Sequence, residues 1–145
     1  EHISFNLTET RDYLNEEGIK GSRKFPKGTI LFPKSGKSAL KNHRGILGEP
    51  AYVVSHFACI IADEKKVDPY YLMHCLTNIK SQDILINDGY PSIRKNIFES
   101  LTIPLPPLIK QKELVKEIRE IVELEDMIKK LKVRLNTKFG KEILE

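Results

Sequence analysis

The chain has 145 residues, of which 40% are hydrophobic and 30% are charged, and this size fits one domain with a substantial apolar core. No apolar run reaches the roughly 18 residues that a membrane-spanning helix needs, and no signal-peptide pattern opens the sequence. The net charge of +4 is modest. Because Cys59 and Cys75 do not make a disulfide scaffold, we expect a cytoplasmic protein without membrane association. The first residue is Glu1, so we expect the chain to begin inside a longer protein.

The first two thirds of the sequence favour a mixed α/β body. Ile3–Leu7 alternates apolar and polar residues, as a half-buried strand does. Gly28–Pro33 is an apolar, β-favouring run that opens with glycine and closes with proline. Ala51–Val54 and Phe57–Ala62 have the composition of further strands.

A helix is predicted to follow these strands. Asp68 can cap it, and Pro69 suits its first position. One face of this helix would carry Tyr71, Leu72, Cys75, Leu76 and Ile79. Ile84–Ile86 then predicts a short strand, Asn87–Gly89 a turn, and Leu101–Ile103 a final strand that runs into a proline-rich junction.

From about residue 107 to 136 the sequence predicts one long helix. Leucine and isoleucine recur in heptads, with Glu117 as the one interruption. The predicted seam consists of Leu114, Ile121, Leu124, Ile128, Leu131 and Leu135. Such a seam is typical of a coiled coil, and at 1.5 Å per residue the helix spans about 40 Å, longer than a domain of this size is wide. The alternative is a helix that packs on its own domain.

Two fragments look like catalytic motifs, and each lacks a required residue. Gly36-Lys37-Ser38 matches the end of a phosphate-binding loop, but Leu31 stands where the full pattern needs glycine. The segment 68–71, Asp-Pro-Tyr-Tyr, looks like the Asp-Pro-Pro-Tyr motif of adenine N6-methyltransferases without its second proline. We therefore expect this chain to catalyse neither nucleotide hydrolysis nor methyl transfer.

The remaining candidates for catalysis or metal binding are also weak. Four carboxylates are scattered through the body: Asp63, Glu64, Asp83 and Asp88. They lack the paired-acid-plus-lysine pattern of nuclease sites. Two histidines and two cysteines lack the Cys-x-x-Cys-type spacing of a zinc site: His56, Cys59, His74 and Cys75. We expect no catalytic residues and no metal.

Charge is distributed unevenly along the body. No acidic residue occurs from Gly18 to Gly48, where eight cations fall: Lys20, Arg23, Lys24, Lys27, Lys34, Lys37, Lys41 and Arg44. Such a stretch is a candidate surface for a polyanion, although acids elsewhere in the fold could also neutralise it. Within it, seven residues are candidates for DNA contact: Lys34, Ser35, Gly36, Lys37, Lys41, Asn42 and Arg44.

The candidate residues divide by the chemistry of DNA recognition. Lysines, Ser35 and the backbone amides around Gly36 can meet phosphate oxygens, whereas the forked side chains of Asn42 and Arg44 suit adenine and guanine edges. A second candidate loop, 89–96, contributes Tyr90, Arg94 and Lys95. Its alternative is a connecting turn whose tyrosine packs on the body.

Three segments carry a family resemblance. Residues 27–36 read Lys-Gly-Thr-Ile-Leu-Phe-Pro-Lys-Ser-Gly, residues 68–72 read Asp-Pro-Tyr-Tyr-Leu, and residues 103–112 read Ile-Pro-Leu-Pro-Pro-Leu-Ile-Lys-Gln-Lys. They resemble, in turn, the first strand and loop, a helix start and the proline junction of target recognition domains in type I restriction-modification specificity subunits. Lys110 stands where the junction usually has glutamate, and the family's tryptophan-containing opening strand is missing.

The resemblance implies a mixed α/β (α+β) fold. A mixed-sheet target recognition domain would occupy residues 1–105, without its natural start, and a long coiled-coil-forming spacer helix would occupy residues 106–145. The chain would be a non-catalytic specificity subunit or half-subunit that docks in the major groove of double-stranded DNA. It would select one half of a bipartite target.

The resemblance also implies the partners. Methyltransferase subunits would bind S-adenosylmethionine and methylate adenine, and restriction subunits would cleave unmodified DNA, so this chain would bind no cofactor itself. We expect two copies to pair through the long helix in an antiparallel coiled coil. Two alternatives stay open: the recognition domain of a single-chain methyltransferase-nuclease, and a coiled-coil interaction protein without DNA binding.

Overall fold

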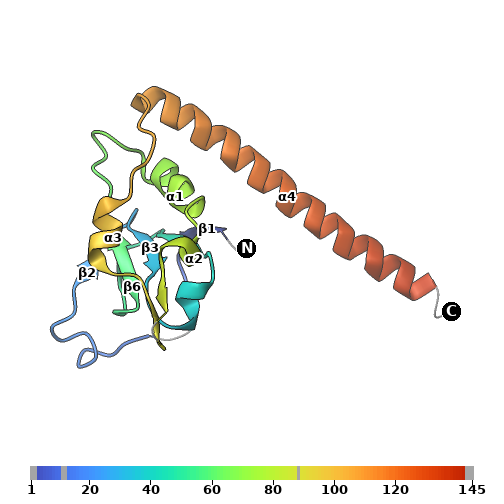
Figure 1. Cartoon of the computed structure of the whole chain (residues 1–145). Coiled ribbons are helices and arrows are strands. Elements are labelled where there is room, and N and C mark those ends of the chain that lie inside the picture. The colour runs from blue at the N-terminus through green and yellow to red at the C-terminus, as the bar shows by residue number, and fades with distance from the viewer. Residues whose placement is uncertain (1–2, 11–12, 88, 143–145) are drawn as a thin grey trace.

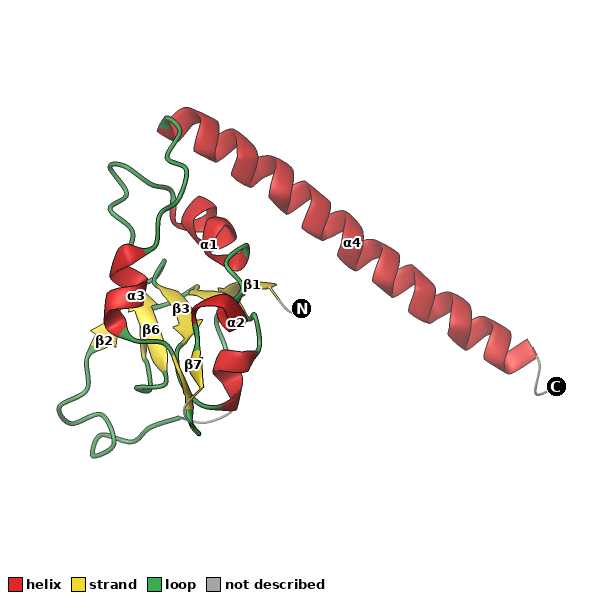
Figure 2. Ribbon diagram, in the orientation of Figure 1, coloured by secondary structure: helices red, strands yellow, loops and turns green. Residues whose placement is uncertain are grey.

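A small mixed sheet and one long helix dominate the computed structural model (Figures 1 and 2), which describes residues 3–10, 13–87 and 89–142. The main sheet has the order β1-β4-β3-β6. Its strands are β1 (Ile3–Leu7), β3 (Ile30–Pro33), β4 (Arg44–Leu47) and β6 (Phe57–Ile60). β1 is parallel to β4, and the other neighbours are antiparallel. The expected mixed α/β fold with a long C-terminal helix is thus confirmed.

Short elements surround this sheet in the described part of the chain. β2 (Lys24–Phe25) pairs with β5 (Ala51–Tyr52), and β7 (Ile86–Asn87) pairs with β8 (Pro91–Ser92), both antiparallel. The helices are the 3-10 turn η1 (Lys37–Leu40), α1 (Pro69–Thr77), α2 (Ser81–Ile84), α3 (Lys95–Ser100) and α4 (Leu108–Glu142).

The core lies between the central strands and the helices. β3 and β4 are buried along their whole length, which explains why their apolar residues run without alternation. The buried core residues are Ile30, Phe32, Ile46, Met73, Leu76 and Ile93. The ring of Phe32 also meets that of Phe98 of α3 edge to face, with 5.0 Å between centroids, so the sheet is held to both α1 and α3.

The start of α1 is as predicted. The carboxylate of Asp68 accepts hydrogen bonds from the backbone N–H groups of Tyr70 and Tyr71, and Pro69 occupies the first turn. Tyr71 and Leu76 are buried, as expected, and Met73 is buried with them. The predicted face was too long, because α1 ends at Thr77 and leaves Ile79 beyond the helix.

Two strand predictions need correction, and one strand was not predicted. The segment Leu101–Ile103 forms no strand in the structure, because none of the described strands pairs with it. Ile84 belongs to α2 rather than to a strand, and β7 begins at Ile86. The central strand β4 was missed, since its first residue, Arg44, had been assigned to a DNA-binding loop.

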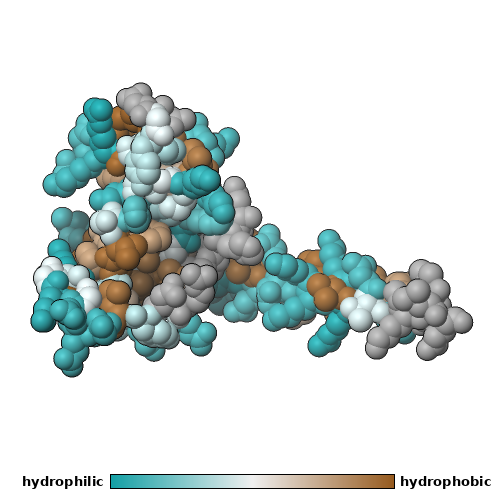
Figure 3. All heavy atoms as spheres, turned by 90° about the horizontal axis from the view of Figure 1, so that it is seen from below, coloured by the Kyte–Doolittle hydropathy of each residue, from teal (hydrophilic) through white to brown (hydrophobic). Residues whose placement is uncertain are grey.

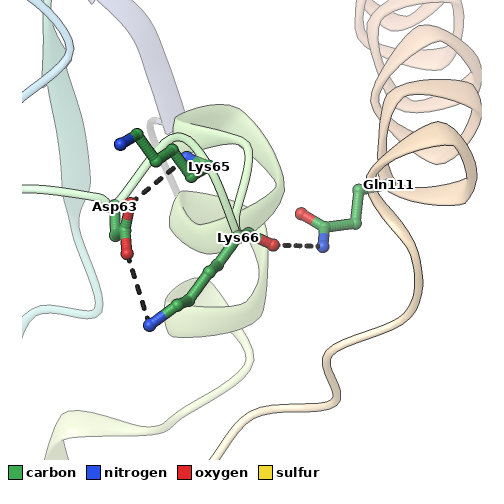
Figure 4. Close-up of polar contacts among 4 residues, drawn as sticks. All are labelled: Asp63, Lys65, Lys66 and Gln111. Atoms are coloured by element: carbon green, nitrogen blue, oxygen red, sulfur yellow. Dashed lines mark hydrogen bonds and ion pairs between the residues drawn. The ribbon is translucent and has the colours of Figure 1, made fainter.

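Helix α4 is fastened to the body at its start (Figure 4). Gln111 is fully buried, and its Oε1 accepts from the backbone N–H of Asp68 at 2.8 Å. Its Nε2 donates to the carbonyls of Lys66 (3.0 Å) and Pro106 (2.7 Å). This amide therefore joins the turn before α1, the proline junction and α4.

Apolar and aromatic contacts support the same attachment. Val115 packs against Val67 and Tyr71 in a second small core, and the hydroxyl of Tyr71 donates to the carbonyl of Pro104 at 3.0 Å. The guanidinium of Arg119 lies over the ring of Tyr70, 4.2 Å from its centroid. Beyond these turns α4 leaves the body, as Figure 1 shows, and its 35 residues span about 52 Å.

We predict that Gln111→Ala lowers the free energy of unfolding by about 2–4 kcal/mol, because it leaves one buried N–H and two buried carbonyls without partners. Urea denaturation followed by circular dichroism measures the loss at a fixed protein concentration. The matched control is Lys112→Ala at the exposed neighbouring position, expected to change stability by less than about 0.5 kcal/mol. Equal effects of the two substitutions would contradict the role of the amide.

Candidate nucleic-acid interface

Three loops that are far apart in sequence are tied together at one edge of the body. The backbone N–H of Lys34 donates to the carbonyl of His56 at 2.8 Å, and the N–H of Ile93 donates to the carbonyl of Lys34 at 2.8 Å. The N–H of Gly36 donates to the carbonyl of Pro91 at 2.9 Å. The loop after β3, the turn before β6 and the β7–β8 hairpin therefore form one surface, which we call the three-loop edge (residues 34–36, 54–56 and 89–94).

Gly36 is needed for this convergence. Its φ of 70° and ψ of −166° lie in a region that is essentially restricted to glycine. A Cβ atom at this position would lie 3.2 Å from the hydroxyl oxygen of Tyr90. The backbone of one loop thus closely approaches the side chain of Tyr90 on another, where a larger residue would be crowded.

The edge includes one exposed residue that the sequence analysis did not select. His56 is exposed, and its Nδ1 shares a hydrogen bond of 2.9 Å with the hydroxyl of Ser35. That bond orients the imidazole and leaves Nε2 as the ring nitrogen that a base or a phosphate could meet. The signal for this residue was its place in the turn between two predicted strands, where binding residues often lie.

The structure brings together most of the predicted DNA-contact residues. Lys34, Ser35, Gly36 and Tyr90 meet in the three-loop edge, and Arg94 is exposed at its end. Lys37 and Lys41 are exposed on and directly after η1. Lys95 is exposed but forms an ion pair with Glu99 at 3.2 Å along α3. Contact of these side chains with DNA stays a prediction.

Two residues predicted to contact DNA, Arg44 and Asn42, bond within the protein instead. Arg44 is 2% exposed, at the start of the central strand β4, and its guanidinium donates hydrogen bonds inward. Asn42 uses both ends of its amide within the protein: Nδ2 donates to the carbonyl of Thr77 at 2.8 Å, and Oδ1 accepts from Arg44 and from the backbone N–H of Ser81. Neither side chain is free to read a base edge.

The basic surface extends from the three-loop edge to β2. Burial raises the pKa of the Cys59 thiol, while the positive charges of Lys34 and Arg23 act to lower it. Both cations therefore lie near the same residue of β6. Lys24, next along β2, lies over the ring of Tyr52 at 5.9 Å from its centroid. Cations from separate parts of the acid-free stretch thus lie near β6 and β5.

Within the described ranges, histidines, cysteines and carboxylates form no cluster of three that could hold a metal ion. The helices of these ranges include none with the length and apolar character to cross a membrane. Asp68, part of the methyltransferase-like fragment, uses its carboxylate to cap α1.

The predicted seam on α4 divides into two parts. Leu114 is half-buried and packs against the cluster of Val67, Tyr71 and Val115, so its placement in a seam with a partner helix needs correction. The other members are between 51% and 58% exposed: Ile121, Leu124, Ile128, Leu131 and Leu135. Figure 3 shows hydrophobic atoms among the hydrophilic ones along the protruding part of α4.

Comparisons with known proteins agree with this architecture. Residues 6–137 match the family model described as the type I restriction modification DNA specificity domain. The chain is 33% identical over 80 residues to the MjaX type I restriction enzyme specificity subunit of Methanocaldococcus jannaschii. The aligned residues make up 54% of this chain and 19% of that subunit.

A solved structure shares the fold. The crystal structure of the HsdS subunit from Thermoanaerobacter tengcongensis matches with a TM-score of 0.59 and 22% identity, over 74% of this chain and 29% of that one. The chain thus spans less than a third of the length of either relative. Because the family model covers nearly all of its residues, the chain belongs to the type I restriction modification DNA specificity domain family.

Proposed function

We propose that this chain recognises double-stranded DNA sequence-specifically, as a specificity subunit or half-subunit of a type I restriction-modification system. The observation that carries the proposal is the family match over residues 6–137. The exposed cations and polar groups at the three-loop edge support it, since phosphate contacts position a protein on DNA and base contacts select the sequence.

The candidate contacts divide between these two tasks. Lys34, Lys37 and Lys41 are the candidates for phosphate, because they lie at the edge or on η1 and carry flexible point charges. Arg94, Tyr90 and His56 are the candidates for the bases. Arg94 has a forked donor set that suits guanine, and the hydroxyl of Tyr90 lies close to Gly36.

The rest of the system would act through other chains. We assign adenine methylation to methyltransferase subunits that bind S-adenosylmethionine, and cleavage to restriction subunits, so this chain has no catalytic residues and no cofactor of its own. The similarity to the MjaX relative, a specificity subunit of a type I restriction enzyme, supports this division of labour.

We predict that the chain binds duplex DNA with an affinity that depends strongly on salt. Each phosphate neutralised by a lysine or arginine releases counterions, so the logarithm of affinity should fall with the logarithm of salt concentration by about 0.9 per contact. Fluorescence anisotropy with a pool of random-sequence duplexes, measured at several salt concentrations, gives this slope. No binding at low salt, or a flat response, would contradict DNA recognition.

We predict that phosphate and base contacts separate by mutation. Lys37→Ala should weaken binding to all sequences and reduce the salt slope by about one, whereas Arg94→Ala should cost about 1–3 kcal/mol at one base pair of the selected target. Selection from a random duplex library defines that target. A Lys37→Ala variant that changes base preference, together with an Arg94→Ala variant that does not, would reverse the assignment.

The second half of α4 offers a surface for pairing. Its stripe, from Ile121 to Leu135, is 51–58% exposed, and a soluble chain rarely leaves such a strip uncovered. The stripe has the heptad spacing that a second helix covers. A second copy of this chain would cover it and would also supply the second recognition domain that a bipartite target needs.

The charges of α4 favour an antiparallel second copy. Acids dominate the segment 113–126: Glu113, Glu117, Glu120, Glu123, Glu125 and Asp126, against Lys116 and Arg119. No acid occurs in the segment 127–141, which carries Lys129, Lys130, Lys132, Arg134, Lys138 and Lys141. Antiparallel pairing places the acidic half of one copy beside the basic half of the other, whereas parallel pairing opposes like charges. The two bodies then lie at opposite ends of the pair.

We predict that replacing Ile128 and Leu131 together by aspartate separates the copies while the body stays folded, because two charges then enter the buried seam. Sedimentation equilibrium gives the mass of wild type and variant. The single substitution Ile128→Ala should cost the pair about 2–5 kcal/mol if its side chain is fully covered.

The control for this experiment is Asn136→Ala, an uncharged residue outside the apolar heptad positions of the same helix, which should leave the dimer intact. A wild-type chain that stays monomeric at high micromolar concentration would exclude self-pairing. The helix would then need a partner from another subunit or from a longer form of this chain.

A further inference from the structure

The buried guanidinium of Arg44 is the centre of a polar network behind the basic surface. Its Nη1 donates to the carbonyl of His43 at 2.7 Å. Its Nη2 lies 3.0–3.1 Å from three oxygens: Asn42 Oδ1, the carbonyl of Ile79 and Ser81 Oγ. The guanidinium carbon also lies 3.2 Å from the centroid of the Phe32 ring.

The network holds a positive charge without a carboxylate. All of these oxygens are neutral, and Nε has no acceptor among the described residues. Burial lowers the pKa of Arg44 to about 10, so the side chain keeps its charge at neutral pH. A charge that is buried without an opposite charge beside it is costly. Stability alone therefore does not explain an arginine at this position.

The groups around Arg44 connect it to segment 37–41, which carries two of the proposed phosphate contacts, Lys37 and Lys41. Asn42, which accepts from Arg44, directly follows Lys41 and is bonded to Thr77 and Ser81 at the junction of α1 and α2. From the same junction, the side-chain amide of Gln82 donates to the carbonyl of Leu40 at 2.7 Å. The C-terminal end of segment 37–41 is therefore held by polar bonds.

A hollow of about 600 Å³ opens beside the end of the segment near Lys41, lined by Asn42, Thr77, Asn78, Lys80 and Gln82. At the other end, Gly36 is bonded to Pro91. Between the two ends Ala39 is fully buried. The segment is thus held by hydrogen bonds on two sides and by one buried side chain between them.

We propose that Arg44 is a positioning residue of the DNA interface. Acting through Asn42 and Ser81, it holds the segment 37–41 in the conformation in which Lys37 and Lys41 meet DNA phosphates. Arg44 itself does not touch DNA. This inference rests on the DNA recognition proposed above and adds a residue that acts from the interior.

The first test is Arg44→Met in the full chain, which fills the volume without the donors. We expect the variant to fold but to lose some stability to urea, because four acceptors lose their donor. The affinity for the random-sequence duplex pool at low salt should fall about tenfold, and amide hydrogen exchange should accelerate in residues 37–41. Arg44→Lys should fail to restore the affinity, since a single ammonium cannot reach all four acceptors.

The decisive readout is the coupling between Arg44 and the lysines. In a background that carries Lys37→Ala and Lys41→Ala, Arg44→Met should reduce affinity much less than in wild type, because the groups that it positions are gone. Ile46→Val, a core change on the same strand, controls for a general loss of packing and should leave affinity unchanged. Should Arg44→Met not fold, Ser81→Ala removes one acceptor and should produce a smaller effect in the same direction.

The outcomes separate the two proposals. A wild-type chain that binds no duplex at low salt overturns DNA recognition and this role with it. Wild-type binding with an unaffected Arg44→Met variant overturns only the role of Arg44. Additive losses in the lysine background, or full rescue by Arg44→Lys, would also overturn it, because the residue would then act through general folding or through its charge alone.

Discussion

The position of the long helix depends on one buried amide. Gln111 joins the proline junction, the turn before α1 and α4 through three hydrogen bonds, and it is fully buried. Hydrogen bonds are directional, so they fix the angle between α4 and the body, which apolar contacts alone would leave adjustable. Val115 adds buried apolar area beside this amide, and Arg119 adds a cation–π contact with Tyr70. Both contacts support the orientation of α4 that the amide defines.

The sequence predicted the parts of the fold whose signals are local. The cap at Asp68, the strand at Ile30 and the heptads of α4 each follow from the neighbouring residues. The strand expected at Leu101–Ile103 failed for a non-local reason: β-propensity cannot reveal whether a partner strand is present. In the structure this segment runs along the body and continues into α4 without a partner strand.

The candidate site was harder to predict because charge alone does not show exposure. Arg44 and Lys41 are close in sequence and both basic, yet the first lies in a central strand and the second in solvent. The run Gly45-Ile46-Leu47 after Arg44 was the available signal for a buried strand. His56 was missed for a different reason: it lies beside Ser35 only because two loops that are distant in sequence meet in the folded chain.

The attachment of α4 matters more as the helix becomes longer. A rotation of about 10° at the anchor displaces the far end of a 35-residue helix by roughly 9 Å, since the helix spans about 52 Å. Such a displacement exceeds two base-pair steps of DNA, at 3.4 Å each. If two copies pair through the outer part of α4, the distance between their recognition surfaces is set at the two anchors as well as by helix length. A satisfied, directional and fully buried anchor is what a fixed spacing between half-sites requires.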